Sequence, residues 1–298
     1  MAAPALADIE RALEHAFREL EIAPLRPLET GFGSTAVETA GSIVFRIPRH
    51  RGSADGHATE ARALPSLGAR LPARVPNPEW RLEPGHADFP LGVIGYRKIP
   101  GTTPAPGSAT DELAADLARF LAALHAFPLD EAESLGLQPG LPPRDAFESE
   151  RDAVLPVLRE ALRPREYRVV VRWWDDLLAD AAMHEFAPAL RHGDPWYGNV
   201  IVDESRRLAG VVDWEGLEIG DPAWDFAAQS YLGRRFFDRV LELAGESRGD
   251  ATLARRARRL AEVREFGGIR LSVAVGDDAE LEDAIAKLRR SSVLFGVL

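Results

Sequence analysis

The segment of residues 190–226 constrains this 298-residue chain more than any other stretch. It contains His192-Gly193-Asp194, followed after four further residues by Asn199, and it places Asp213 at the end of a later apolar run. Residues 200–212 hold two short apolar runs around a polar stretch, a pattern that predicts a β-hairpin. The hairpin would bring Asn199 and Asp213 together at one end of two paired strands.

The spacing of these polar residues is typical of a phosphoryl-transfer site. Such a site needs one carboxylate to accept or orient the proton of an attacking hydroxyl, and a second carboxylate with an amide oxygen to hold Mg²⁺. Asp194 would take the first role, and Asp213 and Asn199 the second. Each alone also suits a turn, a strand start or an ordinary loop. Together, in this order and with Asp-Trp-Glu after an apolar strand, they favour the catalytic interpretation.

The composition is that of a globular protein, since 46% of residues are hydrophobic and 28% charged. The length of 298 residues allows one large domain or two modest ones. The sequence contains no cysteine, which excludes disulfides, thiolate zinc sites and cysteine nucleophiles. No opening run resembles a signal peptide, and the apolar runs are too short to cross a bilayer. We therefore expect a cytoplasmic protein without a membrane partner. A monomer is also expected, although the sequence does not determine the oligomeric state.

The formal net charge of −11 argues against nucleic acid as a partner, because phosphate backbones are bound by clustered cations. It favours a cationic small-molecule ligand, although a solvated acidic surface would give the same count. The basic residues are almost all arginine, with Lys98 and Lys287 the only lysines.

The first hundred residues predict a small antiparallel sheet. An amphipathic helix over residues 8–20 precedes a glycine turn at residues 31–35, and strands are expected at 36–39 and 42–47. Glycine lets backbone amides approach phosphate oxygens closely, so the turn is a candidate phosphate cover, with these residues as ligands: Gly31, Gly33 and Ser34. The same Gly-x-Gly-Ser pattern is also common in hairpin connections.

Arg46 is expected to point into this lobe, because it shares a strand face with Val44 and Pro48. A buried cation needs a partner. The helix predicted over residues 54–67 carries Glu60, so we expect an Arg46–Glu60 ion pair that positions Arg46 on the nucleotide phosphates. The alternative is an exposed arginine and a glutamate on a helix surface.

A domain boundary is expected at residues 102–107, which divides the chain into lobes at 1–101 and 102–298. The preceding residues include a proline-stiffened connector at 71–78 and strands around Leu82 and within 89–96. Ligands favour domain interfaces, so a nucleotide base would lie near the interlobe connection at residues 102–107, with Ile94 and Tyr96 as candidate contacts.

The second lobe is predicted to be mainly helical. Thr110 opens a helix that ends near His125, which we interpret as structural. Further helices are expected at 222–232, 235–243, 251–266 and 277–290, separated by glycine-containing breaks, and two or three lie within 144–186. The fold class is therefore α+β, with a small β-rich lobe and a larger α-rich lobe.

The chain resembles the aminoglycoside phosphotransferase family, the small-molecule branch of the protein-kinase-like fold, along nearly its full length. The most specific motifs are HGDPWYGN at 192–199 and VVDWEGLEIGDPAWDFA at 211–227; the others are the glycine turn at 31–35, FRIP at 45–48, EARALPSL at 60–67 and LAALHAF at 121–127. The resemblance implies a bilobal kinase-like fold. It also implies that His192 and Asp225 support the catalytic loop by hydrogen bonds.

The resemblance further implies a catalytic base at Asp194, Mg²⁺ ligands at Asn199 and Asp213, and a pair between Glu60 and the phosphate-binding cation. Two positions depart from the family pattern. Arg46 stands where many members have lysine, which changes how phosphate would be bound. Trp214 follows the metal aspartate and would fill core volume.

The expected activity is transfer of the γ-phosphoryl group of ATP or GTP to a hydroxyl of an aminoglycoside-type or macrolide antibiotic. VIGYRKIPGTTPAP, at 93–106, is similar to the interlobe region of aminoglycoside 2''-phosphotransferases, and VFRIPRH, at 44–50, is similar to macrolide phosphotransferases. Both subgroups include enzymes that use GTP, so the choice between adenine and guanine nucleotides is left open. The alternatives are a metabolic kinase for an amino alcohol, sugar or homoserine, and a catalytically silent kinase-like binding protein.

Overall fold

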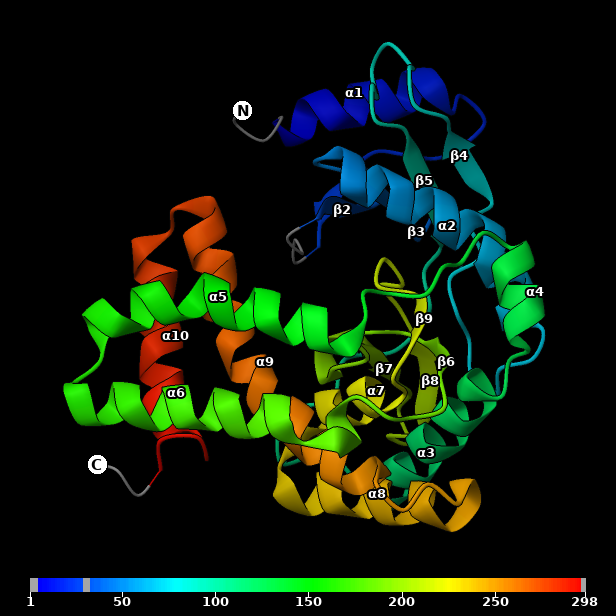
Figure 1. Cartoon of the computed structure of the whole chain (residues 1–298). Helices are drawn as coiled ribbons and strands as arrows, with labels where there is room; N and C mark the ends of the chain where they lie inside the picture. Colours follow the sequence, from blue (N-terminus) through cyan, green and yellow to red (C-terminus); the bar gives the residue numbers. More distant parts are fainter. Residues whose placement is uncertain (1–4, 29–32, 296–298) are drawn as a thin grey trace.

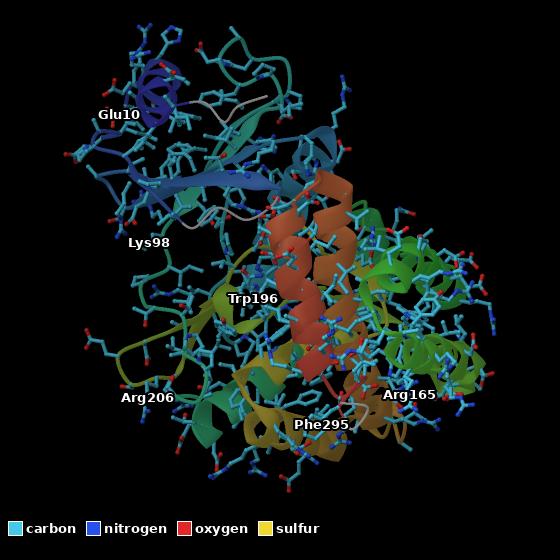
Figure 2. The ribbon with its side chains drawn as sticks, turned by 90° about the vertical axis from the view of Figure 1, so that its left-hand side faces the viewer. Glu10, Lys98, Arg165, Trp196, Arg206 and Phe295 are labelled. Carbon is cyan, nitrogen blue, oxygen red and sulfur yellow. The ribbon has the colours of Figure 1, made fainter. Side chains whose placement is uncertain are left out.

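The computed structural model describes residues 5–28 and 33–295, and it folds into two lobes (Figure 1). The small lobe is a sheet with a helix on each side, and the larger lobe below it is mostly helical. Lys98, at the start of the connection between them, lies at the level where the lobes meet (Figure 2). The predicted α+β, bilobal architecture is confirmed.

The small lobe is built on a five-stranded antiparallel sheet of order β1-β2-β3-β5-β4. Its elements are α1 (Leu6–Ala16), β1 (Arg26–Pro27), β2 (Ser34–Glu38), β3 (Ile43–Pro48), α2 (Arg51–Gly68), β4 (Trp80–Leu82) and β5 (Val93–Arg97). Phe45 and Val93 pack with α1 in one apolar cluster. Arg46 alternates with Phe45 along β3 and therefore faces the opposite side, where α2 lies.

Helix α1 is shorter than the sequence pattern predicts. It ends at Ala16, and Phe17 leaves the helical conformation at φ −127° and ψ 67°. The side chains of Phe17 and Ile22 are both buried in the small-lobe core with Leu13. The chain turns after Phe17 so that both can reach that core, which overrides the helical periodicity up to residue 20.

The large lobe contains eight α-helices and four short strands within the described residues. The helices are α3 (Asp111–His125), α4 (Leu129–Ser134), α5 (Pro143–Ala161), α6 (Pro164–Ala179), α7 (Ala223–Ala227), α8 (Arg234–Arg248), α9 (Leu253–Val275) and α10 (Asp278–Arg290). The strands are β6 (Ala189–Arg191), β7 (Val200–Val202), β8 (Leu208–Val211) and β9 (Glu218–Gly220), and the 3-10 helices are η1 (Ala181–Met183), η2 (Tyr197–Asn199) and η3 (Ala228–Leu232). Helices α5, α6, α9 and α10 group on one side of the lobe (Figure 1).

Helix α9 continues well past Phe266, where the sequence pattern predicts a break. The glycine pair that suggested the break lies inside the helix, because α10 packs closely against it. A Cβ added at Gly268 would lie only 3.3 Å from the Cβ of Ala284 on α10. The helix ends instead at Val275, and the residue after it, Gly276, has a left-handed φ of +71° that suits glycine.

The two lobes share part of their apolar core. The C-terminal part of α2, including Leu64 and Leu67, packs into the large-lobe cluster rather than the small-lobe one. The following segment also pairs with the large lobe, since Arg74 N–H donates to the carbonyl of Ala209 at 3.1 Å. Thr102 pairs with Val202 at the predicted boundary. The division at residue 101 stays a prediction.

None of the helices in residues 5–28 and 33–295 is both long and apolar enough to cross a membrane.

Candidate active site

The loop that carries Asp194 is fixed by a buried carboxylate. Asp225, in α7, accepts hydrogen bonds from the backbone N–H groups of His192 and Gly193 at 3.0 and 2.8 Å. His125 Nε2 lies 2.9 Å from the same carboxylate. Burial opposes the charge of Asp225, but the bond and charge of His125 outweigh it and lower its pKa. The structural roles expected for Asp225, His192 and His125 are confirmed.

Asp194 lies between β6 and η2 with its side chain half exposed, at 50%. Its carboxylate Oδ1 accepts a hydrogen bond from Nη2 of Arg264, in α9, at 2.7 Å. Trp196, two residues further, lies in the large lobe, below Lys98 in the view of Figure 2. Its ring is 6.3 Å from the ring of Tyr231 and nearly perpendicular to it.

The predicted hairpin is confirmed and brings Asn199 and Asp213 together. Strands β7 and β8 are antiparallel, and Val212 N–H donates to the Asn199 carbonyl at 2.9 Å. Asp213 follows at once, with a positive φ of 64° that is uncommon outside glycine. This conformation ends the strand and sets the aspartate at the mouth between the lobes, 43% exposed.

The donor set of these two residues fits Mg²⁺. Asn199 Nδ2 donates to the Asp194 carbonyl at 2.9 Å, which leaves the amide oxygen as the group available to a cation. Asp213 adds a carboxylate, and hard cations prefer oxygen ligands of these two kinds. Which atoms would bind the ion stays a prediction.

Trp214 fills the core behind the hairpin, as expected from its place after an apolar strand. It is fully buried, its Nε1 donates to the Val211 carbonyl at 3.0 Å, and its ring lies 4.4 Å from that of His192. His192 Nε2 lies 3.1 Å from the Val212 carbonyl. Trp214 therefore ties the end of β8 to the loop of Asp194.

Arg46 reaches the site from the small lobe. Its side chain is 7% exposed, and its Nη1 donates to Glu60 Oε1 at 2.6 Å, which confirms the predicted ion pair. Its Nη2 donates to Asp213 Oδ1 and Glu215 Oε1, each at 2.6 Å, across the gap between the lobes. One guanidinium thus serves three carboxylates, and the cluster keeps an excess of negative charge.

Burial and the charges within the cluster together shift the pKa values of Arg46 and Glu60. Burial would lower the pKa of Arg46, but Glu60, Asp213 and Glu215 outweigh it and raise the pKa. Burial raises the pKa of Glu60 to about 7, because Arg46 only partly compensates for it. Among the described residues, Glu60 Oε2 has no hydrogen-bond partner.

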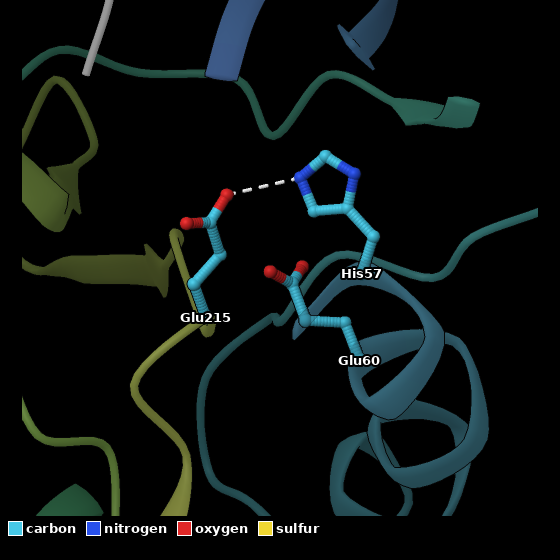
Figure 3. A group of neighbouring side chains, drawn as sticks. All are labelled: His57, Glu60 and Glu215. Carbon is cyan, nitrogen blue, oxygen red and sulfur yellow. Dashed lines mark hydrogen bonds and ion pairs between the residues drawn. The ribbon is translucent and has the colours of Figure 1, made fainter. Parts of the chain in front are cut away.

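Glu215 extends from the large lobe into the small one. Ser34 Oγ donates to Glu215 Oε1 at 2.6 Å, and His57 Nε2 lies 3.0 Å from the same oxygen (Figure 3). Burial opposes its charge, but bonds to His57 and the charge of Arg46 lower the pKa of Glu215 to about 2. Burial also lowers the pKa of His57, so the imidazole is neutral near pH 7. Glu215 therefore occupies donors that we predicted for phosphate.

Gly33 lies close to this carboxylate, so a larger residue here would have to displace side-chain ends. A Cβ at Gly33 would lie 2.5 Å from Glu215 Oε2 and 2.4 Å from Ser53 Oγ. The predicted ligand Gly31 lies outside the described residues. Ser34 is buried at the start of β2, where it faces His57 at 2.9 Å.

His57, Glu60 and Glu215 form the group of side chains best placed to hold a second cation in the described part of the chain. One ligand atom from each lies within 4.8 Å of the others. Arg46 already bonds to both carboxylates, so its guanidinium supplies the positive charge there.

Ile94 and Tyr96, predicted near the nucleotide base, are buried in β5 on the same sheet face as Arg46. Ile94 is the direct cross-strand neighbour of Arg46, and Tyr96 is that of Val44. Burial raises the pKa of Tyr96. Their contact with a base stays a prediction.

Glu215, His57 and Arg264 are site residues for which sequence reasoning assigned no role. The sequence could have identified Glu215, because Asp-Trp-Glu follows an apolar strand and places a second carboxylate two residues after Asp213. No sequence pattern distinguishes Arg264, since it is one of several arginines along a helix.

Comparisons with known proteins agree with this geometry. The family model described as Phosphotransferase enzyme family matches residues 24–265. Viomycin phosphotransferase of Streptomyces vinaceus is 31% identical over 264 residues, which cover 83% of this chain and 86% of that protein.

Two solved structures show the same fold. The GDP complex of wild-type aminoglycoside 2'-phosphotransferase-IIIa superimposes with a TM-score of 0.86 at 22% identity, covering 96% of this chain and 98% of that one. The macrolide 2'-phosphotransferase of Brachybacterium faecium, as apoenzyme, gives a TM-score of 0.71 at 24% identity, covering 95% and 99%. The fold, the two-lobed site and the matched residues lead to one conclusion: the chain belongs to the phosphotransferase enzyme family.

Proposed function

We propose that the protein transfers the γ-phosphoryl group of ATP or GTP to a hydroxyl of an antibiotic, and so confers resistance to it. One observation carries the proposal: Asn199 bonds to the backbone carbonyl of Asp194, and Asp213, next to Asn199 at the end of the hairpin, bonds to Arg46 of the small lobe. The similarity to a viomycin phosphotransferase, and the fold shared with aminoglycoside and macrolide phosphotransferases, support an antibiotic acceptor.

The nucleotide would bind between the lobes with its phosphates on Arg46 and Ser34. Both groups now bond to Glu215, a carboxylate that provides the same oxygen chemistry as a phosphate. A triphosphate would therefore have to displace this contact. Mg²⁺ held by Asp213 and Asn199 would neutralise charge on the bridged phosphates.

Asp194 would accept the proton of the acceptor hydroxyl. Its half-exposed side chain can meet a substrate, whereas the backbone beneath it is fixed by Asp225. The acceptor we expect carries amines, in keeping with the formal net charge of −11. Since the donor is a cellular nucleotide, we place the reaction in the cytoplasm.

The test is phosphorylation by the purified protein with Mg²⁺ and ATP or GTP. The acceptors would be aminoglycosides, macrolides and viomycin, with amino alcohols, sugars and homoserine as the metabolic set, and products would be identified by mass spectrometry. We expect an antibiotic to be phosphorylated and Asp194→Asn to abolish most of that turnover. Phosphorylation of the metabolic set alone would replace the proposal with a metabolic kinase. Failure even to hydrolyse nucleotide slowly would favour a silent binding protein.

A further inference from the structure

Arg264 holds one oxygen of the predicted catalytic base. Its Nη2 lies 2.7 Å from Asp194 Oδ1, a distance typical of a charge-assisted hydrogen bond. The arginine side chain is only 15% exposed, whereas that of Asp194 is 50% exposed. The arginine side chain is therefore held by the protein around it, whereas the aspartate side chain remains accessible to a substrate.

The guanidinium is held in place by the rest of the large lobe. Its Cζ lies 5.2 Å from the centroid of the Tyr231 ring, over the ring face. Helix α9 is itself fixed nearby, because Phe266 packs 4.9 Å from Trp174 and 5.1 Å from Trp173. Burial would lower the pKa of Arg264, but the charge of Asp194 outweighs it and raises the pKa.

We propose that Arg264 is the positioning residue for Asp194. The proposal rests on the proposed function, because it assigns Asp194 to the reacting hydroxyl.

The positioning role follows from the two oxygens of the carboxylate. Arg264 occupies Oδ1, which leaves Oδ2 for the acceptor. In the reaction the acceptor oxygen forms a bond to the γ-phosphorus, the bond from that phosphorus to the β–γ bridging oxygen breaks, and the nucleoside diphosphate leaves. The hydroxyl proton passes to Oδ2 of Asp194. A carboxylate free to rotate would meet the hydroxyl in fewer productive orientations.

The kinetic test compares Arg264→Ala and Arg264→Lys with Arg259→Ala. Arg259 is a matched control, since it also lies on α9, stacks on an aromatic ring (Trp173, 4.7 Å) and pairs with a carboxylate. We expect Arg264→Ala to lower kcat roughly 10- to 100-fold with an unchanged nucleotide KM, and millimolar guanidinium to restore part of it. Arg264→Lys should lose less, and Arg259→Ala little.

A double variant separates positioning from a general loss of structure. If Arg264 acts through Asp194, adding Arg264→Ala to Asp194→Asn should lower kcat no further than Asp194→Asn alone. Wild-type kcat in Arg264→Ala, or losses that multiply in the double variant, would overturn the positioning role.

Nitrogen-15 NMR of the arginine side chains tests the contact without turnover. The Arg264 guanidinium signals of the protein alone should shift in Asp194→Asn, whereas those of Arg259 should not. Unshifted Arg264 signals would overturn the pairing. If the shift occurs but the wild-type protein phosphorylates no acceptor, the proposed function fails while the contact stands.

Discussion

Two arginines contact the carboxylates of the site, and their surroundings differ. Arg46, 7% exposed, is shared by Glu60, Asp213 and Glu215. Arg264, 15% exposed, bonds to Asp194. The cluster around Arg46 has more negative than positive charge, and bound Mg²⁺ would neutralise part of the excess. In the second pair, one guanidinium neutralises one carboxylate. From this difference we expect Arg46 to bind the phosphates and Arg264 to orient the proposed base Asp194.

The largest effect is expected at the carboxylate that Arg264 orients. Asp194→Asn should reduce turnover by roughly 10²–10⁴, because the amide cannot accept the acceptor proton. Initial rates with saturating nucleotide measure this, and circular dichroism checks that the fold is kept. Asp203→Asn, in the exposed turn between β7 and β8, is the matched control. Wild-type turnover in Asp194→Asn would remove the base from the proposed site.

Stability should distinguish the two arginines most clearly. Arg46→Ala leaves Glu60 buried without its cation, and we expect a loss of about 3 kcal/mol in the free energy of unfolding. Arg264→Ala should cost about 1 kcal/mol, since water can reach Asp194. Urea unfolding at pH 7 measures both. Equal losses would contradict the contrast between a buried cluster and an open pair.

The pH dependence should report Glu215, the carboxylate that joins Arg46 from the other lobe. Its pKa is about 2 in the folded protein against an ordinary value of 4.5. Ionised Glu215 therefore stabilises the fold fully above pH 4.5, and this contribution is lost as the pH falls toward 2. The stability difference between wild type and Glu215→Gln should be about 2 kcal/mol at pH 6 and shrink by pH 3. A constant difference would show that ionisation is not involved.

The smallest effect is expected for Arg46→Lys, which keeps the charge but removes the forked donors. Arg46 uses Nη1 for Glu60 and Nη2 for the two carboxylates of the large lobe, a division that one ammonium reproduces poorly. We expect a loss of about 1 kcal/mol in urea unfolding and a weaker nucleotide affinity by equilibrium binding. Unchanged stability and affinity would mean that the separate donors of the Arg46 guanidinium are not needed for either.

Much of the site could be predicted because it depends on local patterns. Alternation along β3 placed Arg46 toward α2, and the two apolar runs of the hairpin brought Asn199 beside Asp213. A pattern of this kind predicts which side chains share a face, since strand geometry repeats every two residues. It failed at the end of α1 and inside α9, where packing by Phe17 and by Gly268 overrode the local signal.

The sequence by itself determined the two-lobed class of fold, the order of the phosphoryl-transfer residues and the pair of Arg46 with Glu60. Only the tertiary structure decided that Glu215 crosses to Ser34 and Arg46, and that Arg264 meets Asp194 from a helix 70 residues away. The physical reason is distance along the chain: no local periodicity relates Arg264 to the loop. That contact exists because the packing of α9 against α10, α7 and α5, with Trp173 and Trp174 of α6 on Phe266, sets where the helix lies.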